Sequence, residues 1–149
     1  MFKAIASVLG IGYVKGGGTV AAAACCGALY LARQLALTTR PGPASLLTVS
    51  ILGLGTWAAQ RVEPAWGKDS YRVVIDEVAG VWVGLLGVPL TGPRLLLGLL
   101  LFRFFDIVKP LGVRKMEKLP GGYGVMLDDV LAGIYTALLL HAGLWLHIL

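Results

Sequence analysis

Residues 125–149 read VMLDDVLAGIYTALLLHAGLWLHIL, and this apolar run sets the class of protein. It is long enough to cross a bilayer, because a membrane-spanning helix needs about 20 predominantly apolar residues. Two adjacent acids, Asp128 and Asp129, interrupt the run near its start. Carboxylates in an apolar segment are costly to desolvate and commonly bind a cation, move a proton or take part in chemistry. The run therefore indicates a membrane helix that carries part of a functional site.

The rest of the chain has the same apolar character. Of its 149 residues, 57% are hydrophobic and only 14% are charged, and the mean hydropathy is +0.80, far outside the range of ordinary soluble domains. Four further apolar segments precede the run, at residues 19–37, 44–60, 75–90 and 94–108. Breaks rich in Gly, Pro or charge separate them, among them Pro41-Gly42-Pro43 and Glu63-Pro64.

These segments predict an all-α fold. We expect one domain over residues 1–149, built as a compact polytopic membrane bundle of about five apolar segments. Several segments are short for a full span, the third and fourth especially, and they would thin the membrane or enter it only in part.

Basic residues predict the orientation. The formal net charge is +5, but the aromatic residues lie in apolar runs and do not alternate with basic ones, so anionic lipid is a better partner than nucleic acid. With the segments taken as spans, nine Lys and Arg residues fall on one side and three on the other, with Arg103 near the end of a span. The positive-inside rule then puts the N-terminus and the loops around Lys68 and Lys115 in the cytoplasm.

This topology brings four polar features to the cytoplasmic face. They are Asp76-Glu77 opening the third segment, Asp106 closing the fourth, Asp128-Asp129 opening the fifth, and the glycine-rich turn that ends in Thr19 opening the first. Segments far apart in the sequence could therefore share one pocket.

Each acidic cluster has a simpler explanation as well. Asp76-Glu77 and Asp128-Asp129 could compensate the dipole at a helix N-terminus, so dipole compensation and a functional site are both open interpretations for them. Asp106 lies at the end of its segment, where the dipole disfavours an anion. Arg103, Asp106 and Lys109 recur every third residue and so share a helix face, either as a salt bridge or as a phosphate clamp beside a metal-holding carboxylate. This pattern favours a site.

The residue types indicate phosphoryl chemistry. Oxygen donors without nearby His or Cys select Mg²⁺ or Mn²⁺ over zinc, and carboxylates beside Arg and Lys suit phosphoryl transfer. The Gly16–Gly18 turn could bind phosphate through backbone N–H groups or serve as a linker. His141 and His147 fall late in the last segment, towards the opposite face, and we expect them to take no part. The residues thus predict a cytoplasm-facing, Mg²⁺-dependent enzyme acting on a phosphorylated lipid.

Three blocks in the chain resemble the phosphatidylglycerophosphatase A family over nearly its whole length. They are IDEVAG at residues 75–80, preceded by Lys68-Asp69, then FRFFDIVKP at 102–110, and GGYGVMLDDVLAG at 121–133. The resemblance implies a phosphatase of phospholipid biosynthesis that converts phosphatidylglycerophosphate to phosphatidylglycerol with Mg²⁺. It also implies a multi-pass protein of the bacterial inner membrane, with its active site facing the cytoplasm and a phospholipid as substrate.

The combined hypothesis assigns roles to nine residues. Five acids would hold one or two Mg²⁺ ions and serve catalysis: Asp76, Glu77, Asp106, Asp128 and Asp129. Four other residues would bind the substrate phosphate: Arg103, Lys109, Lys68 and Thr19. Which acid acts as the general base stays open. A divalent-cation or proton transporter is an alternative that would place its acids near the bilayer midplane, and a non-catalytic membrane assembly protein would not need the acids to converge.

Overall fold

The computed structural model describes residues 1–35, 41–68 and 70–149, and all of the regular structure in them is helical. The elements are α1 (Phe2–Ala6), the 3₁₀ helix η1 (Ile11–Tyr13), α2 (Gly17–Gln34), α3 (Pro41–Trp66), α4 (Ile75–Gly84), α5 (Gly92–Val108), α6 (Val113–Met116) and α7 (Gly122–Trp145). The predicted all-α class is confirmed. The five longest helices correspond to the five apolar segments, although the end of the first segment lies outside the described residues.

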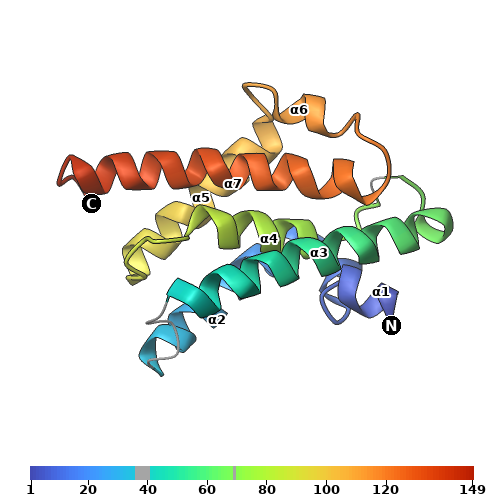
Figure 1. The fold of residues 1–149 in the computed structure, drawn as a ribbon, viewed down its shortest axis with the longest axis horizontal. Coiled ribbons are helices and arrows are strands. Elements are labelled where there is room, and N and C mark those ends of the chain that lie inside the picture. The colour runs from blue at the N-terminus through green and yellow to red at the C-terminus, as the bar shows by residue number, and fades with distance from the viewer. Residues whose placement is uncertain (36–40, 69) are drawn as a thin grey trace.

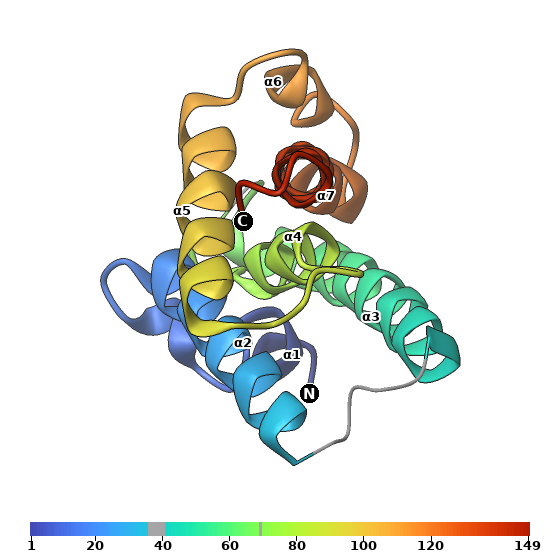
Figure 2. The same ribbon diagram turned by 90° about the vertical axis from the view of Figure 1, so that its left-hand side faces the viewer.

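Helix α4 lies at the centre of the bundle. It contacts α7 on one side, α2 and α3 on the other, and α5 along its flank. Figure 1 shows α1, α6 and the start of α7 at one end of the molecule and the C-terminus at the opposite end. Figure 2, in which α7 is seen end on, shows α5 running across one side of α4 and α7.

Two glycines allow α4 and α7 to touch backbone to backbone. A Cβ atom on Gly133 of α7 would lie 2.2 Å from the carbonyl oxygen of Gly80, and one on Gly80 of α4 would lie 2.6 Å from the carbonyl oxygen of Asp129. No real Cβ atom comes so close, so both positions need glycine at this crossing. The crossing fixes the acidic residues of the two helices side by side.

The core fills the space around α4. Its buried side chains come from α2, α4, α5 and α7, and among the largest are Phe102, Val81 and Leu140. Cys25 and Cys26 face this core from α2, where their thiols lie near the backbone carbonyl oxygens of Val78 and Leu95. Close packing of α2 against α4 and α5 therefore holds the first turn of α2 against the rest of the bundle.

Three predicted boundaries are wrong. Helix α3 continues through Pro64 to Trp66, although a proline inside a helix removes a backbone hydrogen bond and its ring crowds the carbonyl four residues earlier. Helix α4 ends at Gly84 and the chain then turns, with Gly87 at a φ of 73°. Helix α7 begins at Gly122, so Asp128 and Asp129 lie about two turns inside it rather than at its start.

The early start of α7 has a packing reason. Gly121 precedes the helix with a φ of 61°, which favours glycine. A Cβ atom on Gly122 would lie 2.2 Å from the carbonyl oxygen of Thr56, so the first turn of α7 rests directly on the backbone of α3. This contact sets the height at which the acids of α7 enter the bundle.

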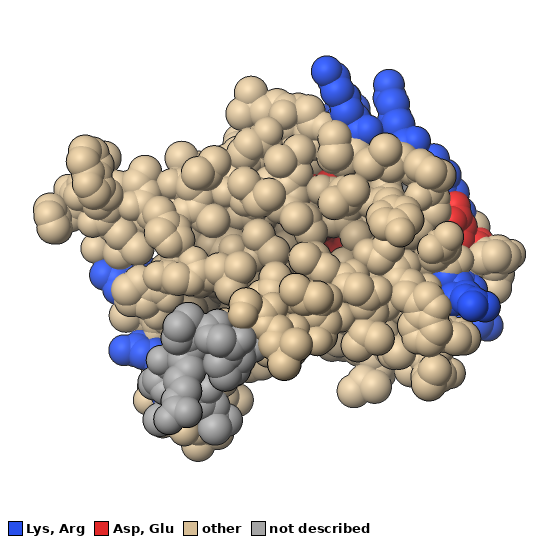
Figure 3. Space-filling view, in the orientation of Figure 1, with Lys and Arg blue, Asp and Glu red and all other residues tan. Residues whose placement is uncertain are grey.

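Among the described residues, one helix, α7, is long and apolar enough to cross a membrane by length and composition. A bundle of about five spans is therefore not confirmed. Figure 3 shows a largely uncharged face, with Lys and Arg gathered at the end that carries α1 and α6 and a smaller group at the opposite end. Large apolar side chains are exposed on this bundle, including Leu100, Phe104 and Leu138. Extensive exposed apolar surface is typical of contact with lipid or another protein.

Candidate functional site

Three carboxylates meet where α4 crosses α7. Asp76, Glu77 and Asp129 each present an oxygen atom, and these atoms lie within 4.8 Å of one another. Asp76 and Asp129 are buried, with 8% and 3% of their surfaces exposed, and Glu77 is half-buried. Residues separated by more than fifty positions in the sequence thus form one acidic cluster.

The end of α5 brings a fourth acid and a cation to this cluster. Asp106 forms an ion pair with Arg103 one turn earlier, and its charge also repels the charges of Glu77 and Asp129. Nη1 of Arg103 lies 3.9 Å from Oε1 of Glu77. The intrahelical salt bridge that the sequence left open is therefore present, and it lies within the acidic cluster instead of on an isolated helix face.

Lys109 pairs with other acids than Asp106, although the sequence placed Arg103, Asp106 and Lys109 on one helix face. Helix α5 ends at Val108, and Lys109 takes a left-handed conformation with a φ of 49°. Its Nζ atom donates hydrogen bonds to Oδ2 of Asp128 at 2.7 Å and to Oε1 of Glu117 at 2.5 Å. Lys109 therefore joins the end of α5 to α7 and to the loop after α6.

The environment of Lys109 keeps it charged. Burial alone would lower the pKa of Lys109, but its hydrogen bonds to Asp128 and Glu117, together with the charges of both acids, raise the pKa above its usual value. Two carboxylates already neutralise this cation. Asp128, adjacent to Asp129 in the sequence, is thus held by Lys109 beside the acidic cluster.

The glycine-rich turn reaches the cluster through its backbone. Gly16 precedes α2 with a φ of 75°, and a Cβ atom on Gly18 would lie 1.9 Å from Oε1 of Glu77. The first turn of α2 therefore packs directly on this carboxylate. Thr19 is exposed on the same turn, and Lys68 is exposed in the connection between α3 and α4. Within the described part of the chain, neither Thr19 nor Lys68 forms a hydrogen bond or ion pair with the acids, and Asp69 lies outside the described residues.

Two polar atoms at this site have no hydrogen-bond partner within the described part of the chain. They are Oε2 of Glu77 and Nε of Arg103, and both are buried. Buried polar atoms are normally hydrogen-bonded, so an unmatched acceptor and an unmatched donor at one site indicate room for a bound group. The acids also repel one another in a poorly solvated place, where protons or a bound cation would compensate their charge.

Helix capping explains little of this arrangement. The residue that precedes α4 is Val74, which offers no polar side chain, and Oδ1 of Asp76 accepts a hydrogen bond from the adjacent N–H of Glu77 at 3.1 Å. Dipole compensation remains available to Asp76 and Glu77 in the first turn of α4. It does not apply to Asp128 and Asp129, because the dipole acts mainly within the first turn.

Sequence reasoning missed Glu117 and the part played by Gly18. Glu117 is the single acid in the basic stretch at residues 114–118, and this isolated opposite charge is the signal that could have marked it. The two histidines lie where the sequence predicted, late in the last segment: His141 is near the C-terminal end of α7, about three turns beyond Asp129, and His147 follows the end of the helix at Trp145. Nδ1 of His141 lies 2.8 Å from the carbonyl oxygen of Ala137.

Comparison with known proteins gives a family for this site. The sequence profile of the family described as phosphatidylglycerophosphatase A matches residues 4–144. A Bacteroides thetaiotaomicron protein named "Putative phosphatidylinositol-3-phosphatase" is 52% identical over 103 residues, which are 66% of this chain and 64% of that protein.

Two further relatives are both named phosphatidylglycerophosphatase A. The Haemophilus influenzae protein is 41% identical over 92 residues, 60% of this chain and 56% of that protein. The Escherichia coli protein is 29% identical over 100 residues, 65% of this chain and 58% of that protein. The chain thus spans less than two thirds of the length of these relatives, and no solved structure matches it. With nearly all of its length matched by the profile, the chain belongs to the phosphatidylglycerophosphatase A family.

Proposed function

We propose that this protein hydrolyses the phosphomonoester of phosphatidylglycerophosphate, giving phosphatidylglycerol and inorganic phosphate in a Mg²⁺-dependent reaction of phospholipid biosynthesis. One observation carries the proposal: carboxylates of α4, α5 and α7 meet in one place beside Arg103. Membership of the phosphatidylglycerophosphatase A family and the names of two relatives support the choice of substrate.

The donor set fits Mg²⁺. All of the clustered ligands are carboxylate oxygens, which hard divalent cations prefer, and Oε2 of Glu77 has no partner among the described residues. Asp76, Glu77 and Asp129 would hold the ion, with Asp106 as a further ligand. When bound, Mg²⁺ would neutralise charge on the phosphate and favour deprotonation of a water molecule.

The chain's own residues would bind and orient the substrate. Arg103 has a buried Nε atom with no partner in the described part of the chain, and its planar guanidinium group suits paired hydrogen bonds to phosphate oxygens. One carboxylate of the cluster would accept the proton of the attacking water. Burial of the cluster strengthens these charge interactions, because little water screens them.

Three other groups would act at the edge of this site. The hydrogen bond between Lys109 and Asp128 would position the neighbouring Asp129, with Glu117 fixing Lys109 from the other side. Thr19 lies in the first turn of α2, and Lys68 lies just after the end of α3. We propose that both contact the lipid head group from the edge of the site. In this account Lys109 supports the site, and Arg103 is the cation that meets the phosphate.

We also place the protein in the bacterial inner membrane, as a single domain that crosses it several times. The apolar length of α7 and the exposed apolar side chains of the bundle support this location. The acids would face the cytoplasm, because nine Lys and Arg residues fall on that side of the predicted topology. Asp76 in the first turn of α4 argues against a transporter with its acids at the midplane.

A phosphate-release assay tests the proposal. The purified chain would be offered phosphatidylglycerophosphate, phosphatidic acid, phosphatidylinositol 3-phosphate and a soluble phosphomonoester, each with and without Mg²⁺. We expect Mg²⁺-dependent release that is fastest on phosphatidylglycerophosphate. The phosphoinositide is included because the 52% identical relative carries a phosphoinositide phosphatase name.

Matched variants separate the site from the rest of the protein. Asp129→Asn should abolish phosphate release, whereas Glu63→Gln, which removes an acid outside the cluster, should not. Faster hydrolysis of phosphatidylinositol 3-phosphate would reassign the substrate. Equal release by both variants and the wild type would overturn the proposed site.

A further inference from the structure

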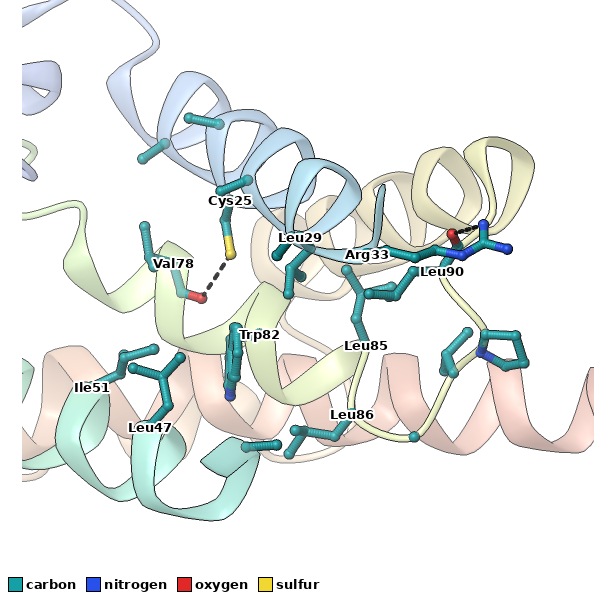
Figure 4. A pocket seen from close by; sticks show the side chains of 18 of the residues that line it. Cys25, Leu29, Arg33, Leu47, Ile51, Val78, Trp82, Leu85, Leu86 and Leu90 are labelled. Atoms are coloured by element: carbon teal, nitrogen blue, oxygen red, sulfur yellow. Dashed lines mark hydrogen bonds between the residues drawn. The ribbon is translucent and has the colours of Figure 1, made fainter. Parts of the chain in front are cut away.

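A long apolar groove lies between α2, α3 and α4, with a volume of about 900 Å³ (Figure 4). This volume falls in the range of pockets that take small organic ligands. Arg33 supplies the only charged side chain among the described residues that line it. The walls are formed mainly by small and aliphatic side chains, including Ala24 and Ala28 of α2, Leu47 and Ile51 of α3, and Val78 and Trp82 of α4.

One end of this groove adjoins the acidic cluster. Val78 directly follows Glu77 on α4, and Ala21 lies one turn beyond Gly18, the residue that packs on the Glu77 carboxylate. Both Val78 and Ala21 line the groove. The groove therefore begins about one helical turn of α2 away from the contact between Gly18 and Glu77.

The other end of the groove lies near Arg33, whose guanidinium group donates a hydrogen bond to the carbonyl oxygen of Leu90. From Ala21 to Arg33 the groove follows α2 for about 18 Å, at about 1.5 Å per helical residue. The hydrocarbon part of one bilayer leaflet is about 15 Å thick, half of the full core. The groove is thus about as long as one leaflet is deep.

The wall near the middle of the groove is flat and apolar. The indole N–H of Trp82 donates a hydrogen bond to Oγ1 of Thr48 at 2.7 Å, which satisfies the polar atom and fixes the ring. On the facing helix, Ala24 and Ala28 leave space that larger side chains would fill. A peptide placed here would bury backbone polar groups against walls with few partners for them, whereas a hydrocarbon chain would not.

We propose that this groove binds one acyl chain of the phospholipid substrate while the phosphate occupies the acidic cluster. The inference rests on the proposed function, and it adds a binding site for the lipid tail. The start of the groove near Glu77, its length of about one leaflet and its apolar walls together select a lipid chain as the occupant.

Fluorescence quenching tests occupancy directly. Replacing Trp57, Trp66 and Trp145 with Phe leaves Trp82 as the single tryptophan. Phosphatidylglycerol with bromines on an acyl chain, added to the protein in detergent, should quench Trp82 saturably. Ala28→Phe, which fills the groove, should remove the saturable part, and Ala23→Phe should keep it because Ala23 is exposed on the same helix outside the groove.

Quenching that rises in proportion to the lipid fraction, equally in all three proteins, would overturn the inference. Hydrolysis provides a second readout. Ala28→Phe should lower kcat/KM at least about tenfold for long-chain phosphatidylglycerophosphate, as expected for the loss of about two buried methylene contacts. A short-chain substrate should be hydrolysed within about threefold of the wild-type rate, since it would not reach the middle of the groove.

An equal loss of kcat/KM for long-chain and short-chain substrates in Ala28→Phe would also contradict the proposed role of the groove. The two proposals fail separately. Saturable quenching without any phosphatase activity would reject the proposed function and keep the groove as a lipid site. Intact hydrolysis without saturable quenching would reject the groove alone.

Discussion

Gly133→Ala should separate the two helices that bring the acids together. The new Cβ atom would lie 2.2 Å from the carbonyl oxygen of Gly80, whereas real Cβ contacts shorter than 3.0 Å essentially never occur. Helices α4 and α7 would therefore have to move apart by at least about 0.8 Å, because the obstacle is a backbone atom that cannot rotate away. Overpacking of this kind costs about 1–3 kcal/mol of stability.

The effect on activity should be larger than the effect on folding. Asp129 lies one turn before Gly133, and Glu77 lies one turn before Gly80, so the separation acts directly on the cluster. A misplacement of about 1 Å at reacting groups can lower a rate by about a hundredfold. We expect kcat/KM for phosphatidylglycerophosphate to fall by about this factor in Gly133→Ala.

The assay pairs phosphate release with thermal unfolding in detergent. Gly27→Ala is the matched control, because Gly27 lies inside α2 with open space around its Cβ position. That change should leave activity unaltered and stabilise the helix by about 0.5–1 kcal/mol. If Gly133→Ala kept turnover within a few-fold of wild type while remaining folded, the close crossing of α4 and α7 would not be what positions the acids.

Four further substitutions test the roles of individual residues. Asp106→Asn should lower phosphate release by orders of magnitude. The melting temperature without Mg²⁺ should stay level, because relief of carboxylate repulsion offsets the lost ion pair. A loss of stability that matched the loss of activity would contradict this expectation. Lys109→Met leaves Asp128 buried without its cation and should lower the melting temperature, and a wild-type melting curve would refute the positioning role. His141→Ala and His147→Ala should each keep turnover and metal affinity within a few-fold of wild type, and loss of activity in either would require a different mechanism.

The end of the bundle at which the acids gather could be predicted from the sequence because it follows from the topology. Apolar segments that alternate in direction bring the start of one helix and the end of the next to the same end of the bundle. Asp76, Glu77, Asp106 and Asp129 meet in the structure for this reason. Composition and periodicity were also sufficient for the all-α class.

The contacts of Lys109 could not be predicted in the same way. Regular helical spacing placed it beside Asp106, but α5 ends one residue earlier and Lys109 adopts a left-handed conformation. Its direction then depends on Glu117 and Asp128, two partners that come from later parts of the chain. Of the two cations that the sequence assigned to this helix face, Arg103 and Lys109, only Arg103 is left beside the proposed phosphate.

The boundaries of the helices show a related limit. Apolar composition continues to residue 90 beyond the end of α4, and it does not reveal that the chain turns after Gly84. Pro64 is expected to break a helix, yet α3 continues for two residues beyond it. Gly121 and Gly122 look like a linker, but one takes a positive φ and the other rests on the backbone of α3, so α7 starts there.

Mn²⁺ binding is the most direct test of whether the acidic cluster is a metal site. Mn²⁺ has the ligand preferences of Mg²⁺, and its bound fraction can be measured by electron paramagnetic resonance in a titration of the purified protein. We expect one class of tight Mn²⁺ binding that Asp76→Asn removes and Glu63→Gln retains. Weak Mn²⁺ binding of equal strength in the wild type and both variants would contradict a metal site at the acidic cluster, independently of the result of the phosphatase assay.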